Sequence, residues 1–117
     1  MTTPVLGSIR QRSTFRALSR PAGRAARGPI RVKYVPNPEA AHDPFVEVGF
    51  AISRHCGNAV VRNRLRRRLR EAIREGAAEL AEGAYLVTTD RAAADLEFAR
   101  LRELSLSALR AAGSPAP

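Results

Sequence analysis

Arginine is crowded into one short segment of this chain. Six arginines fall within the nine residues from Arg62 to Arg70, and Asn63 stands between the first two. A guanidinium group carries a permanent charge and a planar fork of donors, which match the oxygens of a phosphate group. This density of arginine suggests phosphate binding, and a charged surface that faces only water is the alternative.

The neighbouring acids help to choose between these two interpretations. Helix surfaces that face water usually mix acidic and basic residues four positions apart. Only Glu71 and Glu75 accompany the arginines, so the like charges repel one another unless a polyanion binds. The segment therefore predicts contact with a nucleic acid.

The charge of the whole chain favours the same class of partner. The 117 residues carry a net charge of +9. Residues 1–38 hold eight basic residues and no acid, whereas residues 75–117 hold seven acids against four arginines. Regional basic charge is typical of proteins that bind nucleic acids. An acidic membrane surface would also attract it, but would need a broad apolar face beside the basic one.

Length and composition set further limits. A chain of this length fits one domain with a modest core. It has no run of about 18 apolar residues that could span a membrane, and no apolar core of a signal peptide near Met1. We therefore expect a cytoplasmic protein. A single cysteine, Cys56, excludes an internal disulfide and a cysteine-based zinc site.

Residues for independent catalysis are missing from the basic region. His42 and His55 have no cluster of carboxylates or cysteines near them in the sequence, and Cys56 suits a small packed side chain. A nuclease that acts alone would need clustered carboxylates for two metal ions. The basic region offers only Glu47 and Glu71. We expect no catalytic residue and no metal ligand in this chain.

The arginine segment is predicted to be an amphipathic helix. Asn58 suits its N-cap, and the helix runs to about Glu75 and stops near Gly76. Aliphatic side chains recur every three or four residues and form one stripe that can pack on a sheet. The stripe consists of Val61, Leu65, Leu69, Ala72 and Ile73. Most arginines lie opposite it, but Arg62 falls within the apolar sector and is predicted to turn toward the sheet.

The rest of the chain predicts a sheet and two more helices. Alternating apolar residues predict the strands, and Ser13 or Thr14 would cap a short helix that ends before Pro21. Asp95 would cap a last helix that runs to about Ala112. The expected strands are residues 30–35, 45–53 and 84–89, and residues 20–29 are expected to form a basic loop.

The strand at 45–53 has two different faces. Bulky apolar residues occupy one face, and Glu47, Gly49, Ala51 and Ser53 occupy the other. The small face would either meet solvent or form a floor for an extended ligand. Because a helix separates this strand from 84–89, the two can pair in parallel, usually through a right-handed crossover. The element order indicates an α+β or α/β protein.

The segment from 48 to 75, VGFAISRHCGNAVVRNRLRRRLREAIRE, resembles the signature of the bacterial ribonuclease P protein subunit. IRQRSTFRAL is similar to the first helix of that family, and YLVTTDR to its strand ending in arginine. The resemblance implies a single-domain α+β fold, an α-β-β-β-α-β-α sandwich with a mixed sheet. It also implies a left-handed β-α-β crossover through the arginine-rich helix. The domain would span residues 9–112, between a disordered segment at 1–8 and a mobile tail at 113–117.

The resemblance also implies a function. The family's protein binds a catalytic RNA and the single-stranded 5′ leader of precursor tRNA, and assists the Mg²⁺-dependent endonucleolytic removal of that leader. The protein alone would not be catalytic, Mg²⁺ would be held mainly by the RNA subunit, and the protein would be monomeric in the holoenzyme. The alternative is a ribosomal-type RNA-binding protein with a structural role and no turnover.

Site residues follow from the matched motifs. In the family, the leader lies in a cleft between the first helix and the sheet. Ser19 stands where the family often has a second aromatic residue, so stacking on the leader would either be weaker or be supplied by Tyr34 beside Phe15. The residues expected at the catalytic RNA are Arg62, Asn63, Arg64, Arg66, Arg67, Arg68 and Arg70. Those expected around the leader are Phe15, Lys33, Tyr34, Ser53, Arg54 and Asn58.

Overall fold

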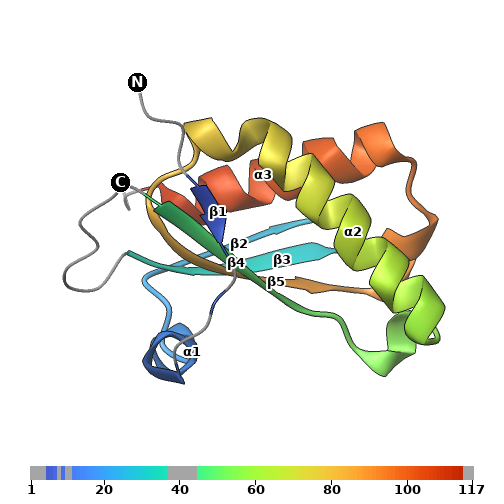
Figure 1. Cartoon of the computed structure of the whole chain (residues 1–117), viewed down its shortest axis with the longest axis horizontal. Helices are drawn as coiled ribbons and strands as arrows, with labels where there is room; N and C mark the ends of the chain where they lie inside the picture. The colour runs from blue at the N-terminus through green and yellow to red at the C-terminus, as the bar shows by residue number, and fades with distance from the viewer. Residues whose placement is uncertain (1–4, 8, 10–11, 37–44, 115–117) are drawn as a thin grey trace.

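A five-stranded mixed sheet separates two unequal layers of helix in the computed structural model, which describes residues 5–7, 9, 12–36 and 45–114. The strand order is β1-β4-β5-β3-β2. Helices α2 and α3 cover one face of the sheet, and the short helix α1 lies against the other (Figure 1). The α+β sandwich with a mixed sheet that the resemblance implied is thereby confirmed.

The strands pair in both directions. Strand β4 (Phe45–Ala51) runs parallel to β5 (Gly83–Thr89), which is antiparallel to β3 (Ile30–Val35). Burial alternates along β3, where Ile30 and Val32 are buried and Arg31 is exposed, as predicted. Strand β4 ends two residues before the predicted Ser53, because the chain turns there into a 3₁₀ helix, η1 (Arg54–Cys56).

Two strands were not predicted from residue patterns. Strand β2 (Gly23–Arg27) pairs with β3 inside the predicted loop at 20–29, and Gly28 makes the turn between them at φ 56°. Strand β1 (Val5–Gly7) pairs in parallel with β4, so the expected disorder of residues 1–8 is wrong for these three. Both strands lie at the edges of the sheet and take their conformation from a neighbouring strand.

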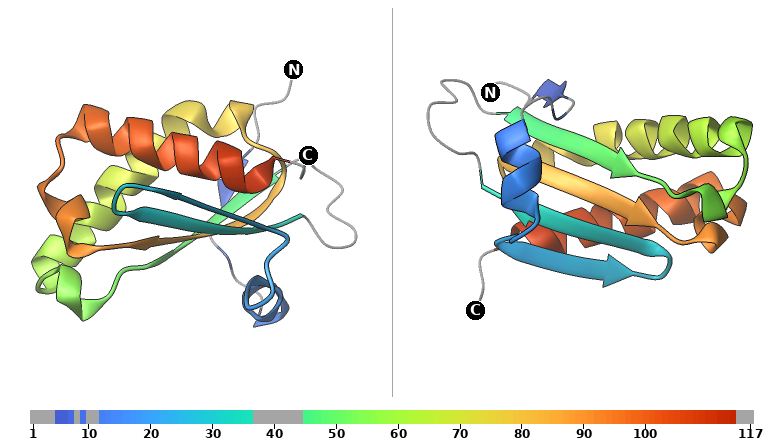
Figure 2. Two further views of the ribbon diagram at one scale, coloured as in Figure 1. Left: turned by 180° about the vertical axis from the view of Figure 1, so that it is seen from behind. Right: turned by 90° about the horizontal axis from the view of Figure 1, so that it is seen from below.

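The connection from β4 through α2 to β5 is left-handed (Figure 2). General preference predicts a right-handed crossover, and that expectation is wrong here. The left-handed crossover implied by the family resemblance is confirmed. It leaves α2 and α3 side by side on one face, while the other face stays open beyond α1.

The helices follow the sequence closely, with two corrections. Helix α1 spans Arg12–Leu18, so Ser13 and Thr14, which were predicted to cap it, lie inside the helix and not at its N-cap. Helix α2 spans Ala59–Gly76, with Asn58 capping it as predicted. Helix α3 spans Phe98–Gly113. Asp95 does not cap it, because Asp95 ends a preceding 3₁₀ helix, η3 (Arg91–Asp95). A third 3₁₀ turn, η2 (Ala77–Glu79), follows α2.

The chain ends differ from the expected boundaries. Gly113 belongs to α3 rather than to a mobile tail, and residues 115–117 of that tail lie outside the described part. In the part of the chain that the structure describes, no helix is both long and apolar enough to cross a membrane.

The aliphatic stripe of α2 anchors the helix to the sheet. Leu65, Leu69 and Ile73 are almost fully buried in the main core, against Val48 and Val87. Burying a leucine or isoleucine contributes roughly 1.5–3 kcal/mol, so the stripe outweighs the repulsion among the arginines of α2. A second, smaller cluster of Leu18, Val35 and Ala84 holds α1 against the opposite face.

Candidate nucleic-acid interface

One flank of α2 carries Arg62, Arg66 and Arg70 above strand β4. The Arg70 guanidinium lies 6.0 Å from the centre of the Phe50 ring, and Arg66 Nη1 donates to Asn63 Oδ1 at 2.9 Å. Arg62 Nε is buried and has no hydrogen-bond partner among the described residues. The predicted turn of Arg62 toward the interior is therefore confirmed.

The outer surface of α2 carries Arg64 and Arg67. Both side chains are exposed, and neither has an ion-pair or hydrogen-bond partner within the described residues. Arg68 differs, because its Nη2 donates to the Leu96 carbonyl oxygen at 2.5 Å and its side chain is partly buried. Arg64 and Arg67 are therefore free to contact a ligand, whereas Arg68 links α2 to the turn between residues 95 and 98.

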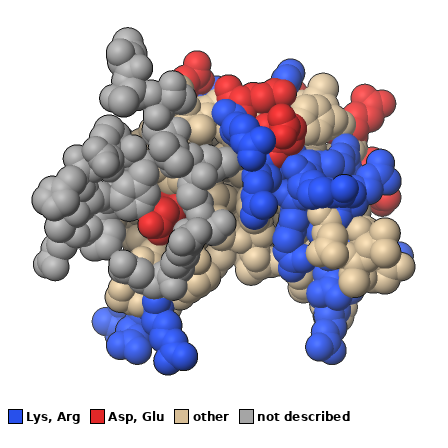
Figure 3. All heavy atoms as spheres, in the orientation of Figure 1, with Lys and Arg blue, Asp and Glu red and all other residues tan. Residues whose placement is uncertain are grey.

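Acidic residues neutralise the surface around α3. Arg102 pairs with Glu75 at 2.8 Å, Arg100 pairs with Glu103 at 3.1 Å, and Arg110 pairs with Glu79. Figure 3 shows the consequence, since basic side chains gather over α2 while acidic ones line the top of the same view. Positive charge without neighbouring acids is thus concentrated over α2 and at the lower edge of this view.

The open face of the sheet forms a second basic surface. Arg24, Arg31, Lys33 and Thr88 line a hollow of about 460 Å³ together with Ala25 and Ala26. Asp90 pairs with Arg31 at 2.5 Å and neutralises part of this charge. Across the sheet, Ala51 of β4 is small and exposed on the same face, whereas the Ile9 side chain covers Gly49, with its Cδ1 only 3.0 Å from where a Cβ would stand. An extended chain could therefore approach the backbone of β4 near Ala51.

Phe15 and Lys33 lie on the α1 side of the sheet. Thr14 and Leu18 of α1 are buried, whereas Phe15 is 48% exposed. Lys33 alternates with the buried Val32 and therefore points to the open face. The structure brings a solvated aromatic ring and a cation to the same side, as the sequence predicted.

Tyr34 does not lie where the sequence analysis expected it, among the residues around the leader. Adjacent residues of a strand point to opposite faces, so Tyr34 lies on the α2–α3 side. Its ring centre is 4.8 Å from that of Tyr85, and its hydroxyl donates to the Glu82 carbonyl oxygen at 2.6 Å. Burial also raises the pKa of Tyr34. Tyr34 supports the core and does not share a surface with Phe15.

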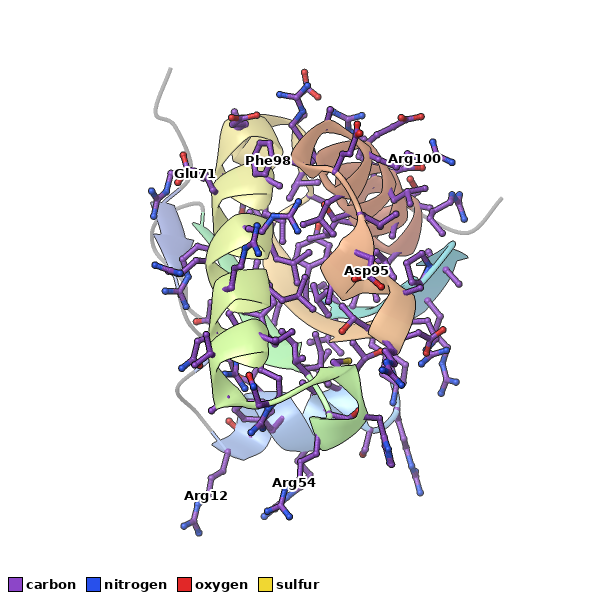
Figure 4. All side chains as sticks on the ribbon, turned by 90° about the vertical axis from the view of Figure 1, so that its right-hand side faces the viewer. Arg12, Arg54, Glu71, Asp95, Phe98 and Arg100 are labelled. Carbon is purple, nitrogen blue, oxygen red and sulfur yellow. The ribbon has the colours of Figure 1, made fainter. Side chains whose placement is uncertain are left out.

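Ser53, Arg54 and Asn58 surround the turn between β4 and α2. Ser53 Oγ accepts from the His55 amide at 3.3 Å, and Asn58 Oδ1 accepts from the Val61 amide at 3.0 Å. The side-chain oxygens of Ser53 and Asn58 thus shape the turn, while the exposed Arg54 points away from it (Figure 4). Gly57 is essential to this geometry, because it has φ 139° and a Cβ there would lie 2.8 Å from Val61.

Three residues of these surfaces were not predicted as site residues. Arg24 and Arg31 belong to the open face, and the predicted alternation of residues 30–35 already placed Arg31 beside Lys33. Phe98 is partly exposed next to α2. Its position depends on the η3 corner, which no sequence pattern indicated.

Acid–base and metal chemistry find little support in the described residues. Among them, no group of three or more His, Cys, Asp or Glu residues could hold a metal ion. Cys56 is buried, with its sulfur 3.5 Å from the Thr89 carbonyl oxygen. Burial raises the pKa of Glu47, which stands alone on β4. The arrangement offers cations, the exposed ring of Phe15 and the small exposed side chain of Ala51.

The fold and these two basic surfaces define a class, a small single-domain α+β protein suited to binding RNA. Comparison with known proteins narrows the class. The sequence model of the family described as Ribonuclease P matches residues 5–113. The chain therefore belongs to the ribonuclease P protein family and is a protein component of ribonuclease P, a ribonucleoprotein of tRNA processing. This assignment decides against the ribosomal-type alternative.

Individual relatives agree with the assignment. A ribonuclease P protein component of Thermobifida fusca is 37% identical over 112 residues, covering 92% of this chain and 76% of the relative. One from Thermus aquaticus is 39% identical over 92 residues, covering 78% of this chain and 52% of the relative. The ribonuclease P protein of Thermotoga maritima superposes with a TM-score of 0.74 at 21% identity, covering 88% and 94% of the two chains. That last likeness shows the fold.

Proposed function

We propose that the outer surface of α2 binds the RNA subunit of ribonuclease P. The observation that carries this proposal is the contrast between two sets of arginines. Arg64 and Arg67 are exposed without partners in the described structure, whereas Arg100, Arg102 and Arg110 of α3 are paired with acids. Keeping unpaired arginines on one helix costs stability through repulsion, and a phosphate backbone would relieve that repulsion.

The open face of the sheet is proposed to hold the single-stranded 5′ leader of precursor tRNA. Unpaired bases stack on aromatic rings, and their phosphates follow basic grooves. Phe15 offers an exposed ring on this side, and Lys33 and Arg24 offer charge on the same face as the exposed Ala51 of β4. Arg54, at the end of β4, extends the basic charge toward α2. Ser53 and Asn58 shape the connecting turn.

The chemistry of cleavage is assigned to the RNA subunit. The described residues provide no cluster of carboxylates, so they do not fit a protein-bound pair of Mg²⁺ ions. We therefore propose that Mg²⁺ is held mainly by the RNA and that the protein positions the precursor tRNA. In this proposal, the protein acts as a monomer in the holoenzyme and works in the cytoplasm beside its tRNA substrate.

Cleavage of precursor tRNA at low Mg²⁺ tests the proposal. The reaction is compared with ribonuclease P RNA alone, with this protein alone and with both together. We expect cleavage at the mature 5′ end to require the RNA and to become faster when the protein is added. Cleavage by the protein alone would refute the division of labour, and a protein that binds RNA without accelerating cleavage would refute its role with the leader.

A further inference from the structure

The strongest unassigned feature is a shallow hollow where the start of α3 meets α2. Its volume is about 460 Å³, which is within the range of sites that hold a small molecule. In Figure 4, Phe98 lies against the outer turns of α2, near Glu71 and above Asp95. The hollow is lined by Arg64, Arg67, Arg68, Glu71 and Phe98.

Phe98 is held in place although its ring is partly exposed. Arg68 Nη2 donates to the Leu96 carbonyl oxygen at 2.5 Å, two residues before Phe98. This bond fixes the corner between η3 and α3, and α3 itself is anchored by the fully buried Leu101. A solvated ring that is already ordered loses little conformational entropy when it binds a ligand.

The charges around the ring select an anionic ligand. Arg64 and Arg67 have no partner in the described structure, and the one acid, Glu71, lies 3.4 Å from Arg74. A flat apolar ring that shares a hollow with free guanidinium groups matches a nucleotide, because the base can stack on the ring while adjacent phosphates meet the arginines. A base within a continuous helical stack has no free face, so the nucleotide has to be unpaired.

We propose that this hollow binds one unpaired nucleotide of the ribonuclease P RNA, with its base stacked on Phe98 and its flanking phosphates on Arg64 and Arg67. The inference rests on the proposed contact between α2 and that RNA, and it extends the contact to α3. It adds an element that reads RNA shape, since arginines on α2 alone would accept any phosphate backbone.

The salt dependence of RNA binding distinguishes a loss of stacking from a loss of charge. Binding of the full-length protein to a ribonuclease P RNA transcript is measured over a range of salt concentrations for the wild type and for Phe98→Leu, Phe98→Tyr and Arg64→Gln. Loss of one stacked base should weaken binding roughly 5- to 150-fold, so Phe98→Leu should lose affinity with an unchanged slope of log K against log salt. Phe98→Tyr keeps an aromatic face and should restore most of the affinity, whereas Arg64→Gln should make the slope shallower.

Each outcome bears on one claim. Wild-type affinity for Phe98→Leu would overturn the stacking inference, and it would leave the proposed function intact as long as Arg64→Gln weakens binding. A slope change in Phe98→Leu equal to that of Arg64→Gln would also overturn it, because Phe98 would then only position the arginines. Failure of Arg64→Gln to alter binding would count against the proposed function itself.

Photocrosslinking gives a readout that does not depend on affinity. A photoreactive phenylalanine analogue placed at position 98 is irradiated in the complex of protein and ribonuclease P RNA, and the attached nucleotide is mapped. We expect attachment to an unpaired nucleotide of that RNA. Attachment within a paired helix, attachment only when precursor tRNA is added, or no attachment at all would overturn the inference.

Discussion

The salt dependence of RNA binding provides the sharpest test of the α2 surface. Replacing Arg64 and Arg67 together by glutamine removes two exposed cations that have no partner in the described structure. Replacing Arg100 and Arg110 by glutamine removes the same charge from α3, where each guanidinium is paired with an acid. Both double variants carry a net charge of +7, because the wild type carries +9 and each loses two arginines.

The expected magnitude follows from counterion release. Each phosphate contact contributes about 0.7–0.9 to the slope of log K against log salt. If a contact contributes nothing at 1 M salt, its loss weakens binding by about 5- to 8-fold at 0.1 M, and loss of two contacts weakens it by about 25- to 60-fold. The α2 double variant should therefore show a slope shallower by about 1.4–1.8 and a large loss of affinity. The α3 double variant should change little.

Fluorescence anisotropy of labelled ribonuclease P RNA, titrated with each protein between about 50 and 200 mM salt, measures both quantities. Circular dichroism confirms that the variants are folded. Equal slopes for the two double variants would refute the reasoning, since binding would then depend on net charge and not on the location of free arginines. A shallower slope for the α3 variant alone would place the RNA on α3 and not on α2.

Three further predictions concern the leader surface and the core. Phe15→Ala should weaken holoenzyme binding of precursor tRNA more than binding of mature tRNA, because the proposed function assigns the exposed ring to the leader, which mature tRNA lacks; equal losses for both tRNAs would contradict this assignment. Tyr85→Phe removes a hydroxyl that donates to the Ala81 carbonyl oxygen at 2.6 Å, and thermal unfolding should show a loss of about 1 kcal/mol, against no change if the bond is unimportant. Burial raises the pKa of Glu47 in the folded protein above its ordinary value of 4.5, so its ionised form weakens folding. Glu47→Gln should be more stable than the wild type at neutral pH, and denaturant titrations should show the difference shrinking as the pH falls through the pKa of Glu47 and the wild-type carboxyl becomes protonated; a difference that grows instead would contradict the sign.

The local periodicity of the sequence was enough to predict the elements that form the core. The 3.6-residue repeat of α2 predicted both its buried stripe and the inward position of Arg62, because a helix fixes the direction of each side chain. The alternation of residues 30–35 likewise predicted the faces of β3. That alternation also placed Tyr34 opposite Lys33, so assigning both to one cleft conflicted with the pattern of the strand itself.

The elements that were missed depend on contacts distant in sequence. Strand β2 has small residues and arginines between glycines, and no local signal favours a strand there. It forms because β3 offers unpaired backbone groups and α3 packs against it, where a Cβ on Gly23 would lie 1.9 Å from the Ala112 carbonyl oxygen. The position of Phe98 depends in the same way on the bond between Arg68 and Leu96.

The packing of α2 on the sheet fixes the distance between the arginine surface of α2 and the open face of the sheet. The helix carries its free arginines on one side, and the sheet carries Lys33 and Arg24 on the side that faces away from α2. Leu65 and Leu69 are 1% and 0% exposed between these surfaces, and only residues 52–58 connect β4 to α2. Because these leucines pack the two layers together in the described structure, the protein of the proposed function would hold the RNA subunit and the leader at a fixed distance from each other. A core change such as Leu69→Ala would then shift the position of the cut as well as lowering affinity.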